Sequence, residues 1–238
     1  MDYVDVIKYK LDSLSEQHQL IEKAAHLIEK TLKSDGLVYA FGTGHSHMLT
    51  EEIFYRAGGL LPIYPIFVDE LMLHRSASTS TKLERLEGLA EKILEGYELS
   101  TIDTFLVISN SGINAVPVEA ALYAKSKGCN VIVITSLEHS KASKPRNSQN
   151  LHLYEIADVV LDNRAPYGDA SIEIGDKKVG PISTITGAFL VNAIIIEIVK
   201  DFKREKINLP VFLSANLKNG DETNDLFLKE YKKRIPIL

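Results

Sequence analysis

The chain has 238 residues, of which 45% are hydrophobic and 25% charged, and its formal net charge at pH 7 is −5. These proportions are those of an ordinary globular protein, and a chain of this length can bury a core without a disulfide framework or a structural metal. The acidic balance and the scattered Lys and Arg residues exclude a typical nucleic-acid binder, because contacts to phosphate backbones need clustered cations.

The cellular compartment is indicated by three further features. The single cysteine, Cys129, excludes a disulfide framework and fits a reducing compartment. The first residues, MDYVDVIKYKLDSLSEQ, include acidic side chains and no apolar core, unlike a signal peptide. No apolar run approaches the ~20 residues that span a bilayer. We therefore expect a cytoplasmic protein with no membrane partner.

The first elements follow from the spacing of apolar residues. Hydrophobic side chains recur every three or four positions over residues 3–33, which predicts a long amphipathic helix that Gly36 ends. The apolar run 37–41 predicts a buried strand, followed by a polar turn and a helix over about 46–57. A second strand is expected over 62–68.

The middle of the chain alternates between strand and helix patterns. The Ser/Thr-rich stretch 76–81 predicts a mobile loop, and a helix is expected over 83–97. Further strands are expected over 104–108, 130–135 and 158–161, and further helices over 114–127, 182–204 and 221–234.

The strands FLVI, VIVIT and VVL are apolar throughout, which is typical of strands buried on both faces. Such strands form parallel sheets covered by helices. The chain shows no internal repeat and no clear linker. We therefore expect one α/β domain over residues 1–238, with an added N-terminal helix and a helical C-terminal extension over about 205–238.

Two strand-to-helix turns carry unusual polar residues. The first reads Gly42-Thr43-Gly44-His45-Ser46-His47, and the second reads Ser109-Asn110-Ser111-Gly112-Ile113-Asn114. In a parallel sheet both turns lie at the carboxyl edge, where ligands bind. Ser and Asn are also common helix N-caps, so either turn alone has a purely structural explanation. Two in one sheet favour an anion site built from backbone N–H groups, hydroxyls and helix dipoles.

The type of anion is narrowed by what these turns lack. GTGHSH has no third glycine at the spacing of a dinucleotide-binding fingerprint. No Walker lysine follows either glycine turn. A dinucleotide or a nucleoside triphosphate is therefore excluded as the expected ligand, and we expect no cofactor.

At these residues the sequence resembles the SIS (sugar isomerase) domain family of phosphosugar-binding proteins. The family carries a G-x-G-x-S turn and an S-x-S-G-x-[ST] turn, which match residues 42–46 and 109–114, although Asn114 replaces the usual Ser or Thr. A strand of the form A-D-x-x-L matches 157–161, and a late Ser/Thr pair matches 183–184. With its C-terminal segment LPVFLSANLKNGDETN, the chain is most similar to a small bacterial subgroup of the family.

The resemblance implies a Rossmann-like three-layer sandwich with a five-stranded parallel sheet, a sugar phosphate as the ligand, and a homodimer or higher homo-oligomer. It also implies which residues form the phosphosugar site: Gly44, His45, Ser46, Ser109, Asn110, Ser111, Asn114, Ser183 and Thr184.

The catalytic residues are less clear from the pattern. Phosphoheptose isomerases, which are similar in the first turn, place a glutamate where this chain has Arg56, and a histidine on a late helix that here has none. Other SIS isomerases carry a histidine after an acidic residue behind the second strand, which matches Glu70 and His74. We expect His74 to open the sugar ring or transfer a proton, and Glu52 to act as its partner. The alternatives are an ordinary loop histidine and a solvated helix face.

The other polar groups have weaker support. His45 and His47 flank Ser46, but two histidines without a third ligand are a weak metal signal, so no metal is expected. His139 carries no supporting pattern and is expected to be structural or exposed. Asp169 follows the last predicted strand and is a possible contact for sugar hydroxyls.

Two classes of function remain open from the sequence. The first is an enzyme: a sugar-phosphate isomerase that interconverts an aldose and a ketose, or a lyase or etherase that acts on an amino-sugar phosphate. The second is a non-catalytic phosphosugar-binding regulator. Regulators of this kind usually carry a DNA-binding helix-turn-helix, and no basic module precedes residue 37, which favours an enzyme.

Overall fold

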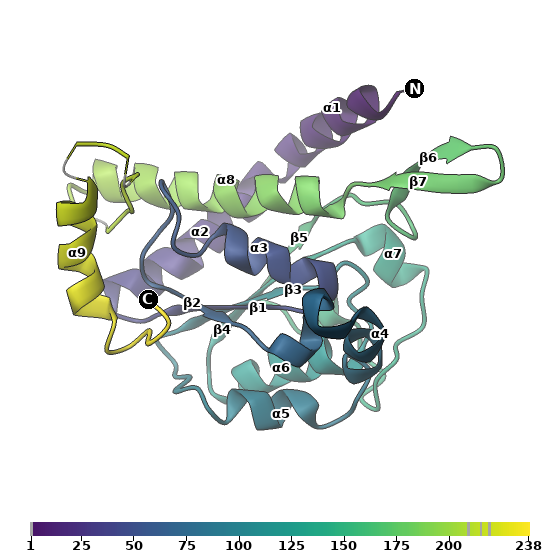
Figure 1. The fold of residues 1–238 in the computed structure, drawn as a ribbon, viewed down its shortest axis with the longest axis horizontal. Coiled ribbons are helices and arrows are strands. Elements are labelled where there is room, and N and C mark those ends of the chain that lie inside the picture. Colours follow the sequence, from purple (N-terminus) through teal and green to yellow (C-terminus); the bar gives the residue numbers. More distant parts are fainter. Residues whose placement is uncertain (1, 209, 215, 219) are drawn as a thin grey trace.

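A five-stranded parallel sheet forms the centre of the computed structural model, which describes residues 2–208, 210–214, 216–218 and 220–238. The strands lie in the order β2-β1-β3-β4-β5 (Figure 1). This order makes β1 and β3 neighbours although β2 lies between them in the sequence. The strands are β1 (Val38–Gly42), β2 (Ile63–Ile66), β3 (Thr104–Ile108), β4 (Asn130–Thr135) and β5 (Val159–Asp162).

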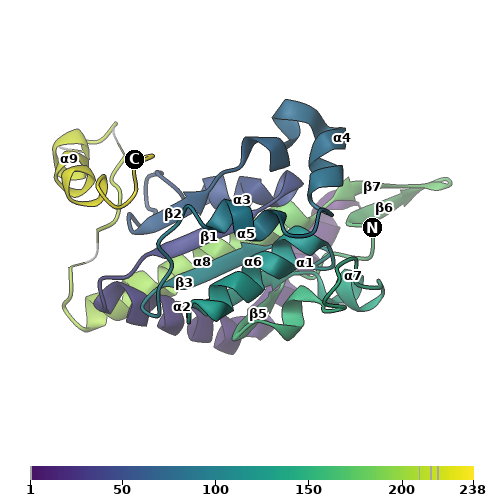
Figure 2. The ribbon, with the colours of Figure 1, turned by 90° about the horizontal axis from the view of Figure 1, so that it is seen from below.

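Helices cover both faces of the sheet, as Figures 1 and 2 show. One layer contains α1, α2, α3 and α8, and the other contains α5 and α6. No helix in the described ranges is long and apolar enough to cross a bilayer. The helices are α1 (Tyr3–Leu14), α2 (His18–Lys33), α3 (His47–Glu52), α4 (Leu73–Leu83), α5 (Leu89–Leu94), α6 (Ala115–Ser126), α7 (Leu137–Lys141), α8 (Ser183–Arg204) and α9 (Gly220–Tyr231).

The strands are buried on both faces because their side chains alternate between two hydrophobic cores. On β1, Val38 and Ala40 pack in the core under α2 and α8, whereas Tyr39 and Phe41 pack in the core under α5 and α6. Successive side chains of a strand point to opposite faces, so an apolar residue is needed at every position. The expectation of a parallel sheet covered by helices is confirmed.

The long helix expected over residues 3–33 is interrupted. A 3₁₀ turn over Ser15–Gln17 separates α1 from α2. The Gln17 side chain is buried there and makes two hydrogen bonds to the Asp162 backbone at the end of β5, with lengths of 2.7 and 2.8 Å. This tertiary contact lies at the break between the two helices and leaves the apolar spacing unaltered, so the pattern could not reveal it.

The loop expected over 76–81 is instead helical and belongs to α4, which has a kink at Ser76. The Ser76 hydroxyl accepts a hydrogen bond from the Thr79 N–H and so caps the second part of the helix. Ser80 is buried, and its hydroxyl donates to the Leu71 carbonyl at 2.8 Å. Side-chain capping and a tertiary hydrogen bond outweigh the weak helix propensity of Ser and Thr.

A two-stranded hairpin between β5 and α8 was not expected from the sequence. It consists of β6 (Ala170–Ile174) and β7 (Lys177–Pro181), and its tip projects away from the body of the molecule (Figures 1 and 2). The Tyr3 hydroxyl donates to the Pro181 carbonyl at 2.6 Å, which ties its base to α1. The base of the hairpin therefore reaches the carboxyl edge of the sheet, whereas α9 lies at the opposite end (Figure 1).

Candidate phosphosugar site

A cavity lies at the carboxyl ends of β1 and β3, the two strands between which the strand order of the sheet reverses. The helices that follow these two strands, α3 and α6, pack on opposite faces of the sheet. Such a switch point leaves a crevice at the carboxyl edge, and here it forms a cavity of about 390 Å³. All residues assigned to phosphosugar binding by resemblance line this cavity: Gly44, His45, Ser46, Ser109, Asn110, Ser111, Asn114, Ser183 and Thr184.

The turn after β1 is tight because Gly42 has no side chain. A Cβ atom on Gly42 would lie 2.8 Å from the carbonyl carbon and oxygen of Ser46. The chain folds back at this point, and the Ser46 N–H donates to the Thr43 carbonyl at 2.9 Å. The backbone of this turn therefore lies close to the cavity.

The two histidines of this turn have different surroundings. His47 is buried, and its Nδ1 pairs with the carbonyl oxygen of Gly44 in the same turn. His45 is exposed and lines the cavity. In the ranges that the structure describes, no group of three or more His, Cys, Asp or Glu side chains is arranged to hold a metal ion. The metal assignment itself stays a prediction.

The turn after β3 depends on Gly112. Its φ angle is +60°, and a Cβ atom would lie 2.9 Å from the Thr135 hydroxyl oxygen. Its N–H donates to the Ser109 hydroxyl at 3.2 Å, which closes the turn. Glycine is the residue that adopts this left-handed conformation without steric cost. The turn brings Ser109 and Ser111 to the cavity.

Asn110 is held in place by residues that follow β4 and β5. Its side-chain oxygen accepts a hydrogen bond from the Asn163 amide at 2.9 Å. Its backbone carbonyl accepts hydrogen bonds from the Ser136 N–H and the Thr135 hydroxyl. Because the Asn110 oxygen is already engaged with Asn163, its amide N–H₂ group is the part that remains for a ligand.

The N-cap side chain of α6 lies at the cavity without a capping partner. Asn114 is its N-cap residue, but the Asn114 side chain makes no capping hydrogen bond. This side chain belongs to a residue only 7% exposed, and its Oδ1 lacks a partner in the described part of the chain. A buried acceptor without a partner is costly, so this oxygen indicates a place where a donor, such as a hydroxyl of a ligand or a water, completes the site.

The start of α8 is closed by Asp169. One carboxylate oxygen accepts hydrogen bonds from the N–H groups of Ile182 and Ser183, at 3.1 and 2.8 Å. The other accepts from the Ser183 hydroxyl at 2.7 Å. Asp169 itself lines the cavity, and its φ angle of +71° brings the carboxylate back toward α8. The helix dipole is thus matched by a charge of the protein itself.

Glu84 supplies a second carboxylate to the cavity. It follows the end of α4, and its Oε1 accepts a hydrogen bond from the Thr43 hydroxyl at 2.8 Å. Its backbone carbonyl accepts from the Val116 N–H in the first turn of α6, at 3.1 Å. Glu84 is therefore positioned by both turns that form the site.

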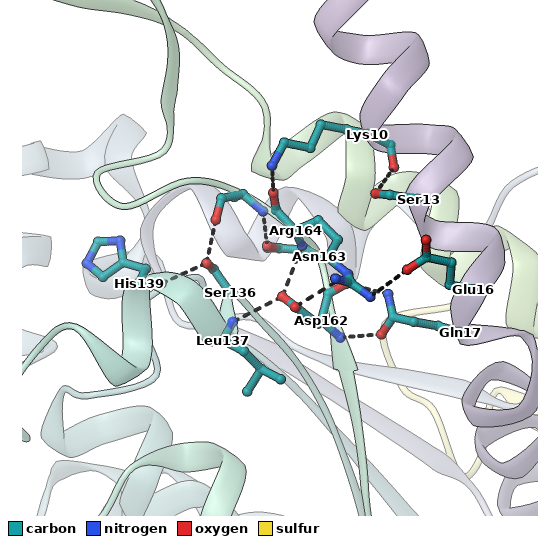
Figure 3. A network of polar contacts seen from close by, with 11 residues as sticks. Lys10, Ser13, Glu16, Gln17, Ser136, Leu137, His139, Asp162, Asn163 and Arg164 are labelled. Carbon is teal, nitrogen blue, oxygen red and sulfur yellow. Dashed lines mark hydrogen bonds and ion pairs between the residues drawn. The ribbon is translucent and has the colours of Figure 1, made fainter.

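His139 also lines the cavity, from α7. Ser136 caps this helix: its hydroxyl accepts from the His139 N–H at 3.0 Å and donates to the Ala165 carbonyl at 2.6 Å (Figure 3). The Gly168 N–H donates to His139 Nδ1 at 3.3 Å. Because a backbone N–H can only donate, Nδ1 is unprotonated and the neutral ring carries its proton on Nε2.

The pKa of His139 is lowered from its ordinary value, chiefly because burial penalises the charged ring. The Asp169 carboxylate opposes this shift, the Arg146 charge adds to it, and Glu138 opposes it. At neutral pH the ring is therefore neutral, and its Nε2–H is a proton donor.

The three residues expected to be catalytic do not line this cavity. Glu52 lies between α3 and α8, where it pairs with Arg56 and accepts from the Asn192 amide. Glu70 is exposed in the 3₁₀ turn before α4, and His74 is exposed in the first turn of α4. Their catalytic roles stay predictions.

Sequence reasoning missed Glu84 and His139 and gave Asp169 only a minor place. Glu84 lies in no strand-to-helix turn, and its proximity to Thr43 arises from the path of α4, which no local pattern shows. His139 had a usable signal, because it follows β4 by four residues and so belongs to the same carboxyl edge as the two serine turns.

Comparisons with known proteins identify the family of this chain. Residues 2–136 match the SIS domain family. The UPF0309 protein of Geobacillus kaustophilus is 43% identical over 227 residues, which cover 94% of this chain and 90% of that protein. The UPF0309 protein of Listeria innocua is 38% identical over 240 residues, which cover 100% of this chain and 97% of that protein.

Solved structures share the fold at low sequence identity. A phosphoheptose isomerase from Neisseria gonorrhoeae is 17% identical, with a TM-score of 0.53 over 83% of this chain and 97% of that chain. One from Francisella tularensis is 17% identical, with a TM-score of 0.52 over 84% of this chain and 100% of that chain. At this identity the likeness concerns the fold alone. Together with the family match and the close relatives, it establishes that the chain belongs to the SIS domain family.

Proposed function

We propose that the cavity binds a sugar phosphate, with the phosphate at the start of α6. SIS-domain membership supports a phosphosugar-binding protein. The observation that carries the placement is the N-cap side chain of Asn114, which makes no capping hydrogen bond and lines the cavity together with Ser111. The volume of about 390 Å³ is within the range of small-molecule sites.

The phosphate is held by hydrogen bonds and by the dipole of α6. The Ser111 hydroxyl and the Asn114 amide supply the donors. In the first turn of α6 the Val116 N–H already donates to the Glu84 carbonyl and Pro117 has no N–H, so the side chains carry the hydrogen bonding. The positive end of the dipole adds to this attraction. No Lys or Arg is needed, and in the described chain none lines the cavity.

The chemistry we propose is aldose–ketose isomerisation. This reaction needs a base that moves a proton between neighbouring carbons and an acid that exchanges protons with the sugar oxygens. Glu84 is a carboxylate in the cavity with one oxygen hydrogen-bonded to Thr43, and it takes the role of the base. His139, with its proton on Nε2, takes the role of the acid.

The rival assignment from the sequence places the acid at His74 and the base at Glu52, with Glu70 in support. In this single chain Glu52 is engaged by Arg56 and Asn192, which argues for a structural role. His74 is free of such a contact among the described hydrogen bonds and ion pairs, so it needs a direct test.

A two-step experiment tests the proposal. Thermal-shift screening with a panel of sugar phosphates first finds those that bind, and NMR in deuterated water then follows exchange of the proton next to the carbonyl. We expect exchange by the wild type and a loss of about 10² or more in Glu84→Gln and His139→Asn, with His74→Ala close to the wild type. Full exchange in His139→Asn together with loss in His74→Ala would reverse the assignment. Binding without exchange in the wild type would favour the non-catalytic regulator.

We also propose a homodimer in the cytoplasm. On α8 the side chains of Ile185, Phe189 and Ile196 are 36%, 39% and 53% exposed, and they recur at helical spacing on one face. An exposed apolar stripe of this kind is typical of a subunit contact. Val4 and Tyr9 of α1 are also exposed, so the amphipathic segment 3–33 is a second candidate for the contact. Light scattering on the wild type and on Phe189→Glu tests the dimer.

A further inference from the structure

The cavity combines hydrogen-bond donors with two carboxylates. The donors beside α6 are the Ser111 hydroxyl and the Asn110 amide. The Asp169 carboxylate lies at the start of α8, which is called the carboxylate end here, and the Glu84 carboxylate lies beside Thr43 and the first turn of α6. In the described residues that line the cavity there is no Lys or Arg to neutralise these two charges.

Asp169 occupies the place where a second anion would otherwise bind. The first N–H groups of α8 and the Ser183 hydroxyl would form a second anion site next to the one at α6. All three of these donors are already engaged by the Asp169 carboxylate. A second phosphate or a carboxylate of the ligand would find these three donors occupied and would face a like charge.

Arg146 does not neutralise the carboxylates of the cavity. Arg146 acts on His139 through its charge, but its side chain is exposed and it does not line the cavity. The two cavity histidines are His45, which is exposed on the first turn, and His139, whose pKa is lowered by burial. The carboxylate end is thus negative at neutral pH.

We propose that Asp169, supported by Glu84, restricts the cavity to sugar phosphates that carry a single anionic group. Bisphosphates and phosphorylated sugar acids are excluded, whereas neutral sugars and sugars with a free amine are accepted at the carboxylate end. This inference rests on the proposed phosphosugar binding and narrows its substrate class. It also bears on the lyase alternative, because an amino-sugar phosphate whose ether substituent carries a carboxylate is rejected.

Isothermal titration calorimetry with two matched ligand pairs tests the proposal. Fructose 6-phosphate is compared with fructose 1,6-bisphosphate, and glucose 6-phosphate with 6-phosphogluconate, at constant ionic strength. In the wild type we expect the doubly anionic member to bind at least about tenfold more weakly, because like charges at close range are strongly unfavourable. In Asp169→Asn this ratio falls by about fivefold or more, since the charge is removed.

The variant and its control are chosen to keep the fold. Asn at position 169 keeps an oxygen that accepts from the Ile182 and Ser183 N–H groups, so the start of α8 stays capped. Glu84→Gln provides an independent variant at the second carboxylate that lines the cavity. The control is Asp176→Asn, which removes an exposed carboxylate in the hairpin turn that does not line the cavity, and its ratio matches the wild type.

The outcomes separate the two proposals. Equal affinity for both members of each pair in the wild type overturns the specificity inference and leaves phosphosugar binding intact. A wild-type ratio that persists in both Asp169→Asn and Glu84→Gln also overturns it. If no sugar phosphate binds the wild type, the proposed function fails and the inference fails with it.

Discussion

The starts of α6 and α8 border the same cavity, but they are treated in opposite ways. At α6 the N-cap side chain of Asn114 makes no capping hydrogen bond, and its buried oxygen has no partner in the described chain. At α8 the donors of Ile182 and Ser183 are all directed at the Asp169 carboxylate. At α6 the side-chain donors of Ser111 and Asn114 remain for an external anion, whereas at α8 the protein supplies an internal one.

The difference shows that a serine before a helix is not sufficient evidence of a ligand contact. Ser111 and Ser183 were expected in the same site from the sequence, and both line the cavity. The Ser183 hydroxyl is nevertheless used to hold Asp169. What decides the role of a helix start is whether its donors already have partners.

We expect the largest effect on stability and binding from a substitution that distorts the turn before α6. Gly112→Ala places a Cβ atom 2.9 Å from the Thr135 hydroxyl in a backbone with φ of +60°. We expect the free energy of unfolding to fall by about 3 kcal/mol, from left-handed strain and steric overlap together, and phosphate binding to be lost. Urea denaturation followed by circular dichroism measures the first effect, and calorimetry the second.

The matched control for this variant is Gly175→Ala. Gly175 has a similar φ of +64° in the hairpin turn, but a Cβ atom there meets nothing within 4 Å. Its cost should be only the conformational strain, about 1 kcal/mol. Equal destabilisation by the two variants would show that the close approach to Thr135 is not important.

A pair of serine variants compares the two helix starts directly. Ser111→Ala should weaken phosphosugar binding by about 1.5–3 kcal/mol, or roughly ten- to a hundredfold, because a donor to a charged group is removed. Ser183→Ala should lower the free energy of unfolding by about 1 kcal/mol, because one hydrogen bond to Asp169 is lost, and should change affinity less than about twofold. Calorimetry and urea denaturation on both proteins measure these effects, and an exchange of the two outcomes would contradict the distinction.

The smallest expected effect concerns pH and His139, which lies beside Asp169. The pKa of His139 is lower in the folded chain than its ordinary value of ~6.5. The unfolded chain therefore binds more protons below about pH 6.5, and the stability that neutral His139 contributes is lost as the pH falls. Urea denaturation between pH 7 and pH 5 should show a smaller loss in His139→Gln than in the wild type. Identical pH profiles of the two proteins would refute this, with exposed His26→Gln as the control.

Much of the fold could be predicted because apolar runs mark buried parallel strands. The expected strands over 104–108 and 130–135 match β3 and β4 at both ends. The break between α1 and α2 and the helical character of α4 depend on side chains that bond to distant backbone, such as Gln17 and Ser80. These contacts leave no periodic signal.

The site was predictable where it depends on strand-to-helix turns. Residues such as Ser46 and Ser109 could be placed at one edge because all parallel strands end there. Glu84 and Asp169 reach that edge from α4 and from the base of a hairpin, whose paths are set by tertiary packing. The sequence therefore located the residues of the two serine turns better than the two carboxylates.

The most direct test of the central claim is calorimetry with a sugar and its phosphate. For each sugar phosphate that binds, the wild type is titrated with that compound and with the unphosphorylated sugar, alongside Ser111→Ala. We predict that the unphosphorylated sugar binds at least about a hundredfold more weakly, and that Ser111→Ala lowers affinity for the phosphate form only. Equal affinity of the wild type for a sugar and its phosphate would contradict an anion site at the start of α6.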